Sequence, residues 1–258
     1  SEYASNYLAL LQQSKRVGFE IDLAPSDEYG QIDVEALDRM IRPSTRLIAI
    51  THVPTQGGLV NPAVAVGSIA KKHGVRYLLD ACQSVGQLEV DVKAIGCDFY
   101  TLAGHKLYGP SGSGALWVRR ERAAEMQPYR GGGDMIREVT RDAVTYAAPP
   151  LRFEAGTPAI VAQIGLGAAL RYLGGIGMAR IRAHEQALVA HARAELAKVP
   201  GIELFGMAPG KGPLFSFRLE RVGSPQRLAA LLDQEGIAVR AGSFCSQPLM
   251  AALGVTAL

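Results

Sequence analysis

The stretches LLDACQS at residues 78–84 and FYTLAGHK at residues 99–106 decide the predicted fold. Each begins as a continuous apolar run and ends near a residue that can do chemistry, Asp80 in the first and Lys106 in the second. Short apolar runs bounded by turns are typical of strands that are buried on both faces of a mostly parallel sheet. Ligands bind such sheets outside the carboxyl ends of the strands. We therefore expect Asp80 and Lys106 to face one crevice.

An acid and an amine in one crevice suit a particular kind of cofactor chemistry. A carboxylate such as that of Asp80 can hold the proton of a pyridinium ring, and an amine such as that of Lys106 can form a Schiff base with an aldehyde cofactor. These are the two groups that a protein contributes to pyridoxal phosphate chemistry. The alternative is that Asp80 only caps the following turn and Lys106 is a solvated surface amine.

The segments around these two runs alternate between strand-like and helical patterns. Residues 17–23 and 47–53 are apolar or alternating and predict strands, with a helix at residues 34–41 between them. Residues 63–73 place apolar side chains on one face of a helix, and residues 114–118 predict a further strand. This order of elements indicates an α/β fold with a mostly parallel sheet.

The second half of the chain has a different character. Residues 127–157 predict a long irregular segment, and residues 158–199 predict a long helical region that breaks near Gly174-Gly175. A small α+β unit should follow, with strands at residues 202–205, 214–219 and 237–240 and a helix at residues 225–234. We therefore expect two domains. Residues 1–158 would form a large cofactor-binding domain, and residues 159–258 a connecting helix and a small C-terminal domain.

The composition of the 258 residues excludes several classes of function. The chain is 48% hydrophobic and 20% charged, which is typical of a globular protein. Its 27 Lys and Arg residues are scattered, which argues against nucleic acid as a partner, and no apolar stretch predicts a membrane span. Three cysteines neither pair evenly nor form a CxxC motif, so we expect no disulfide framework, no metal site and a cytoplasmic protein.

Five segments in chain order carry a resemblance to a known family: THVPTQGGLVNP at 51–62, YLLDACQSVGQ at 77–87, CDFYTLAGHKLYGPSGSG at 97–114, RFEAGTP at 152–158 and GIAVRAGSFCSQPLM at 236–250. The sequence resembles the class V aminotransferase-like enzymes of fold-type I, which use pyridoxal phosphate. Within them it is most similar to the cysteine desulfurase and selenocysteine lyase branch, which serves iron–sulfur cluster assembly. The resemblance spans the whole chain. It implies that segments of the family lie before Ser1 and after Leu258, so that residues 1–258 lack both ends of the fold.

The resemblance assigns four residues to the cofactor. Lys106 would form the Schiff base and later move the α-proton of the substrate, and Asp80 would pair with the ring nitrogen. Gln83 would hydrogen-bond the phenolic oxygen. His105 would contact the phosphate, although a partly buried structural histidine is the alternative because adjacent side chains point in different directions.

The resemblance also implies roles for residues farther along the chain. Tyr3 would stack on the cofactor face where the family usually has a histidine, but a phenol with a pKa of about 10 cannot exchange protons near neutral pH. Thr55 stands where the family usually has an asparagine that binds the cofactor or the substrate. Thr157 would reach the phosphate of a neighbouring subunit's cofactor, which implies a homodimer with shared sites.

Cys245 determines which reaction we expect within the family. A cysteine desulfurase needs a thiolate on a flexible loop to take the sulfur from the substrate, which gives a persulfide and alanine. Cys245 lies in such a loop, whereas Cys82 and Cys97 are expected to pack as small hydrophobic residues. Arg240 would bind the substrate carboxylate or lower the pKa of the thiol. A surface ion pair is the alternative for this arginine.

The expected activity is therefore conversion of L-cysteine, or of selenocysteine, to alanine, with sulfur passed from Cys245 to an acceptor protein. Ala103 and Phe244 replace polar residues that are common in the desulfurase branch. One alternative is therefore a carbon–sulfur lyase or aminotransferase-like enzyme of class V that does not use Cys245. The other is a piece of the fold that cannot turn over.

Overall fold

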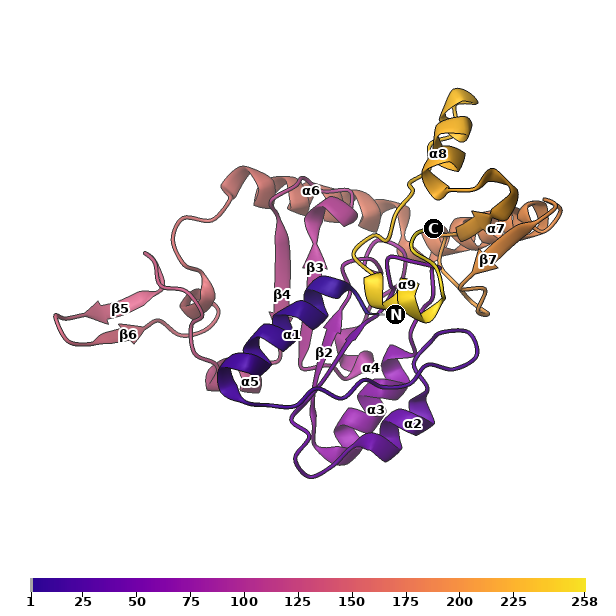
Figure 1. Ribbon diagram of the computed structural model, residues 1–258. Helices are drawn as coiled ribbons and strands as arrows, with labels where there is room; N and C mark the ends of the chain where they lie inside the picture. The colour runs from indigo at the N-terminus through magenta and orange to yellow at the C-terminus, as the bar shows by residue number, and fades with distance from the viewer. Residues whose placement is uncertain (1) are drawn as a thin grey trace.

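The computed structural model describes residues 2–258. A four-stranded sheet is at the centre of the fold (Figure 1). Its strands are adjacent in chain order: β1 (Leu47–Thr51), β2 (Arg76–Asp80), β3 (Phe99–Ala103) and β4 (Gly114–Val118). The first three are parallel, and β4 runs antiparallel to β3. The α/β prediction is confirmed, and the sheet is mixed, with three parallel strands and one antiparallel strand.

The register of the sheet brings three strand ends together. Thr51 pairs with Asp80, and Asp80 pairs with Thr101. The carboxyl ends of β1, β2 and β3 therefore form one row of residues. This row is where the predicted site must lie.

The main hydrophobic core forms where helices α2 (Val34–Met40), α3 (Ala63–His73) and α4 (Val92–Ile95) pack on the sheet (Figure 1). It includes Val66 of α3 and the fully buried Tyr77 and Leu79 of β2. Burying each such side chain contributes about 1.5–3 kcal/mol. At Gly67 an added Cβ would lie 1.8 Å from the carbonyl oxygen of Ile95, so only glycine allows α3 and α4 to approach this closely.

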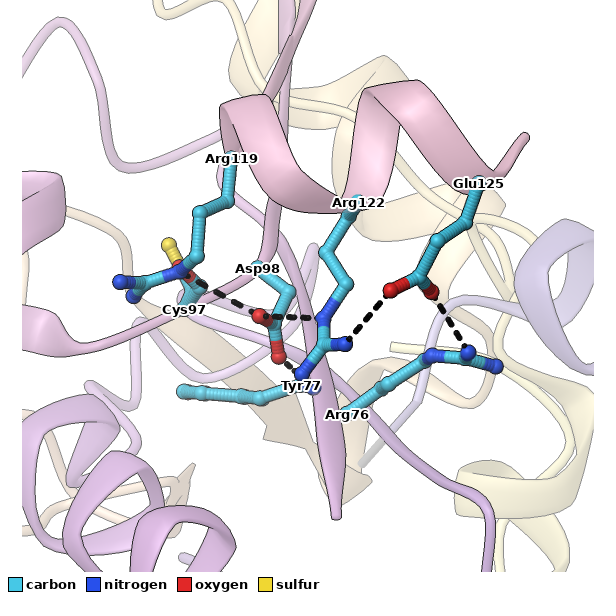
Figure 2. A network of polar contacts seen from close by, with 7 residues as sticks. All are labelled: Arg76, Tyr77, Cys97, Asp98, Arg119, Arg122 and Glu125. Atoms are coloured by element: carbon cyan, nitrogen blue, oxygen red, sulfur yellow. Dashed lines mark hydrogen bonds and ion pairs between the residues drawn. The ribbon is translucent and has the colours of Figure 1, made fainter. Parts of the chain in front are cut away.

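A network of charged residues connects the strands at the end of the sheet opposite to the row of Thr51, Asp80 and Thr101 (Figure 2). The carboxylate of Asp98, just before β3, accepts hydrogen bonds from the backbone N–H of Tyr77 (3.0 Å) and from Nε of Arg122 (3.1 Å). Arg119 lies 3.3 Å from the same carboxylate. Glu125 of helix α5 (Arg120–Glu125) pairs with Arg76 at 2.9 Å. The network thus joins the start of β2, the start of β3 and the end of β4.

Replacing Asp98 by alanine should cost about 3 kcal/mol of unfolding free energy, since it leaves a buried N–H and two arginines without their partner. Urea denaturation of parent and variant measures this difference. Glu125→Gln is the control. Its ion pairs are about half exposed and should contribute less than about 1 kcal/mol. Equal losses in the two variants would show that Asp98 is not the centre of the network.

The second half begins with a hairpin and a bent pair of helices. Strands β5 (Ile136–Val139) and β6 (Val144–Tyr146) form a hairpin that stands away from the rest of the molecule (Figure 1). Helix α6 (Ile160–Ile176) then meets α7 (Met178–Leu196) at an angle of 76°. Among the described residues, no single helix is long and apolar enough to cross a membrane. The bent pair of α6 and α7, taken together, is long and apolar enough, but only by length and composition.

The chain ends in a small mixed region. It contains β7 (Ile202–Phe205) antiparallel to β8 (Ser216–Leu219), followed by α8 (Pro225–Gln234) and α9 (Gln247–Ala252). Short 3-10 turns occur at Gly104–Lys106, Leu151–Phe153 and Glu220–Val222. Buried hydrogen bonds link Ser216 to Gln56 and Gly57 of the first half. This region is therefore not clearly a separate domain.

Three predictions about elements are wrong. Val17 ends helix α1 (Ala4–Val17), Gly18 comes next at φ 81°, and residues 18–23 pair with no described strand. Residues 237–240 likewise form no strand, because β7 and β8 pair only with each other in the described chain. The segment predicted to be irregular contains the β5–β6 hairpin. The break between the long helices falls at Gly177 (φ 91°), close to the predicted Gly174-Gly175, so that prediction is confirmed.

Candidate functional site

A cavity of about 310 Å³ lies at the row of strand ends. Its walls come from the start of α1, from the ends of β1, β2 and β3, and from the turns after these strands. The lining residues are Tyr3, Asn6, Thr51, Val53, Thr55, Asp80, Cys82, Gln83, Thr101 and Lys106. The structure therefore brings five predicted site residues together, namely Tyr3, Thr55, Asp80, Gln83 and Lys106.

Asp80 is the most constrained residue of the cavity. Its Oδ1 accepts hydrogen bonds from the backbone N–H of Cys82 (3.0 Å) and from the hydroxyl of Thr101 (3.3 Å). Its Oδ2 accepts one from Nδ2 of Asn6 at 2.7 Å. Burial raises the pKa of Asp80, but these hydrogen bonds outweigh burial and place the pKa below its ordinary value of 3.8. The carboxylate is therefore charged at neutral pH.

The turn that carries Lys106 is fixed by glycines. Gly104 donates its N–H to the carbonyl of Ser113 (2.8 Å), and an added Cβ there would lie 1.9 Å from the Ser113 hydroxyl. Gly109 donates to the Gly104 carbonyl at 2.9 Å and closes the turn. The ammonium of Lys106 lies 5.9 Å from the centre of the Tyr3 ring. The amine and the aromatic ring thus border the same space.

Asn6 belongs to the site although the sequence pattern did not single it out. Besides Asp80, its Nδ2 donates to Oε1 of Glu2 at 2.9 Å. Glu2 in turn accepts hydrogen bonds from the backbone N–H and the hydroxyl of Thr51. A polar residue three positions after Tyr3 was the available signal, since residues at i and i+3 share a face of a helix.

Two of the three cysteines are held as neutral thiols. Cys97 is buried in the core, as predicted, and burial raises its pKa to about 11. Cys82 lines the cavity instead of packing only as a small hydrophobic residue. Burial and, next, the Asp80 carboxylate raise the pKa of Cys82 to about 11. Neither thiol is therefore available as a thiolate nucleophile at neutral pH.

Cys245 is exposed and lies beside the cavity without lining it. Its carbonyl accepts a hydrogen bond from the N–H of Ala4 at 2.7 Å, next to Tyr3. Phe244 and Cys245 adopt left-handed backbone conformations, with φ angles of 48° and 58°. Such conformations cost about 1–3 kcal/mol each and persist only where surrounding contacts impose them. The predicted nucleophile is thus on a strained, exposed segment at the edge of the site.

Besides Cys245, three predicted site residues lie outside the cavity lining. The side chains of His105 and Thr157 are exposed. The guanidinium of Arg240 lies 4.8 Å from the centre of the Phe244 ring. Arg240 lines a second cavity of about 370 Å³, which is bordered by β8 and α8. The predicted roles of these residues in binding phosphate or substrate stay predictions.

The residues of the cavity fit a pyridoxal cofactor. A charged carboxylate has about four acceptor positions, and three on Asp80 are used, which leaves one on Oδ2 for a pyridinium N–H. Lys106 supplies the amine, and Tyr3 supplies an aromatic face. The volume lies at the lower end of the range for small-molecule sites, about 300–1,000 Å³. No group of three metal-binding side chains occurs among residues 2–258.

Comparisons with known proteins agree with this arrangement. Residues 1–258 match the family described as Aminotransferase class-V. A probable cysteine desulfurase of Xylella fastidiosa is 43% identical over 99% of this chain and 61% of its own length. The structure of a cysteine desulfurase from Thermococcus onnurineus superposes with a TM-score of 0.94 at 33% identity, covering 99% of this chain and 64% of that one.

A more distant solved structure, C-DES, is 25% identical with a TM-score of 0.74 and covers 91% of this chain and 63% of its own. It was solved with glycine covalently linked to its PLP cofactor. The chain spans about three fifths of the length of these relatives.

Proposed function

Because the chain belongs to the class V aminotransferase family, we propose that its cavity holds pyridoxal phosphate and that it acts as a cysteine desulfurase of fold-type I. One observation carries the proposal: a charged carboxylate and an amine from neighbouring strand ends face one cavity. When bound, the cofactor supplies an electron sink for bonds at the α-carbon of an amino acid. Asp80 would keep the ring nitrogen protonated, and Tyr3 would cover one face of the ring.

The residues of this chain would divide the work of sulfur transfer. Lys106 would hold the cofactor and move the α-proton of the substrate. The thiolate of Cys245 would attack the sulfur of bound L-cysteine, so that the carbon–sulfur bond breaks and a sulfur–sulfur bond forms. The three-carbon product takes up a proton and leaves as L-alanine. The exposed position of Cys245 beside the cavity supports this role, because the persulfide must also meet its acceptor.

Further roles complete the proposal. Gln83 would bind the phenolic oxygen, His105 the cofactor phosphate, and Thr157 the phosphate in a neighbouring copy, which requires a homodimer. Arg240 would bind the substrate carboxylate after leaving the Phe244 ring. The same proposal includes a boundary between two domains at residues 158 and 159 and a cytoplasmic location. It also includes selenocysteine as a second substrate and delivery of sulfur to an acceptor protein for iron–sulfur cluster assembly.

A second candidate function has its own support. Cys245 does not line the cavity, and Arg240 is stacked on Phe244. A carbon–sulfur lyase or aminotransferase-like enzyme would need neither residue. A piece of the fold without turnover is the third candidate.

Replacing Cys245 by alanine separates the first two candidates. The variant should lose alanine formation from L-cysteine and the persulfide, because no thiolate can take the sulfur, while the absorbance of bound cofactor stays unchanged. Mass spectrometry of the peptide that contains Cys245 detects the added sulfur atom in the parent. Continued release of ammonia and pyruvate by the variant would support a lyase and contradict the desulfurase proposal.

A further inference from the structure

Thr55 connects the cavity to the Cys245 segment, defined here as residues 243–246. Its hydroxyl oxygen lies 3.2 Å from the carbonyl oxygen of Phe244 and 3.1 Å from the hydroxyl of Ser246. A hydroxyl has one proton to donate, and the Phe244 carbonyl can only accept. Thr55 therefore donates to Phe244. The single proton of the Ser246 hydroxyl has two acceptors within reach, the Thr55 oxygen at 3.1 Å and the same Phe244 carbonyl at 3.5 Å. The Thr55 hydroxyl thus contacts the residues immediately before and after Cys245.

The Cys245 segment needs contacts of this kind to keep its shape. Phe244 and Cys245 both have positive φ angles, a backbone region that residues with a Cβ rarely occupy without outside support. Ser246 is 2% exposed, so one end of the segment is anchored in the interior. The hydrogen bond from Ala4 to the Cys245 carbonyl is a third attachment. The thiol itself remains exposed.

The loop that carries Thr55 is itself fixed. The next residue, Gln56, is 2% exposed, and its Oε1 accepts a hydrogen bond from the Ser216 hydroxyl at 2.8 Å. The same hydroxyl accepts one from the N–H of Gly57 at 2.9 Å. Ser216 is also buried. Thr55 is thus the side chain through which a rigid loop at the cavity holds a strained exposed segment.

We propose that Thr55 is a positioning residue that latches the Cys245 segment to the edge of the cavity. This inference rests on the proposed role of Cys245 as the sulfur acceptor. It differs from the role expected for Thr55 from the sequence, because the single proton of its hydroxyl is directed at Phe244 and not at a cofactor or substrate. Loss of the latch should free the segment while the cofactor stays bound.

Hydrogen exchange measured by mass spectrometry tests the latch in the purified, cofactor-loaded protein. Thr55→Val keeps the shape of the side chain and removes the hydroxyl. Exchange of peptides that cover residues 240–247, and of the Ala4 amide, should become about three- to ten-fold faster, the effect of one or two net hydrogen bonds. Thr55→Ser should restore the parent rate, and Ser246→Ala should raise it. Thr145→Val, at an exposed strand position, is the matched control.

Two further measurements distinguish the possible results. Unchanged exchange in Thr55→Val overturns the latch. Unchanged exchange together with weaker cofactor binding makes Thr55 a cofactor ligand instead. Faster exchange with unchanged cofactor absorbance and slower persulfide formation supports it. Exchange does not depend on turnover, so a parent protein without desulfurase activity would refute the proposed function and still show whether the latch exists. Melting curves confirm that each variant is folded.

Discussion

Replacing Lys106 by alanine is expected to abolish turnover of L-cysteine, with a fall in rate of about 10³-fold or more, because covalent attachment and proton transfer are lost together. The ammonium of Lys106 is held beside Tyr3 by a turn that Gly104 and Gly109 fix. No other lysine lines the cavity among the described residues. The protein fold should be unaffected, since this side chain is only partly buried.

Cofactor attachment gives a direct measurement of this prediction. After incubation with pyridoxal phosphate and reduction with borohydride, the parent should carry the cofactor mass on the peptide that contains Lys106. The Lys106→Ala variant should carry it on no specific peptide. Lys93→Ala, which removes a lysine of α4 that does not line the cavity, is the control and should behave like the parent. Specific labelling of another lysine in the parent would contradict the assignment of the site.

Asp80→Asn should be the second most damaging change, with a loss of about 10²–10³-fold in turnover. The variant keeps the size of the side chain but lacks the negative charge that would hold the ring proton. The hydrogen bonds at the site lower the pKa of Asp80 below 3.8, so the parent carboxylate stays charged above that pH. The defect should therefore be the same at every pH between about 5 and 8.

The thiol of Cys82 provides a second readout of the same variant, independent of activity. The Asp80 carboxylate is, after burial, the main reason that the pKa of Cys82 is raised to about 11. In Asp80→Asn this pKa should fall, so alkylation of Cys82 should begin at a lower pH. Asp38→Asn removes a carboxylate that pairs with Lys72 and His73 on the surface, and it should leave Cys82 unchanged. An unaltered pH profile for Cys82 in Asp80→Asn would contradict the proposed coupling.

The helices and strands that could be predicted are those whose conformation is determined by residues close together in the sequence. Helix α3 and strands β2 and β3 have clear apolar patterns and bury them in one core, so their predicted bounds are nearly correct. The ends of these strands then placed Asp80 and Lys106 at one cavity. Residues 18–23 and 237–240 also have strand-like composition, but strands require partners, and composition does not reveal which segments find one.

The rest of the site depends on tertiary contacts. Asn6 reaches Asp80 across 74 positions of sequence, and no local pattern indicates that distance. The Cys245 segment is held by Thr55, which is 190 positions earlier in the chain than Cys245. Arg240 could be recognised as a conspicuous cation, but its stacking on Phe244 results from the path of a loop. Residue types predicted the chemistry, and packing decided which residues share a cavity.

Helix α1 is attached to the molecule mainly by the site itself. None of its 14 residues, all of which the structure describes, is buried, and Leu8 is 52% exposed. Helix α1 is held at its start by two hydrogen bonds, one from Asn6 to Asp80 and one from Ala4 to the Cys245 carbonyl. The helix therefore has little free energy of docking of its own. Docking of α1 and assembly of the cavity form one thermodynamic unit, and a ligand that binds only the assembled cavity stabilises the docked helix by mass action.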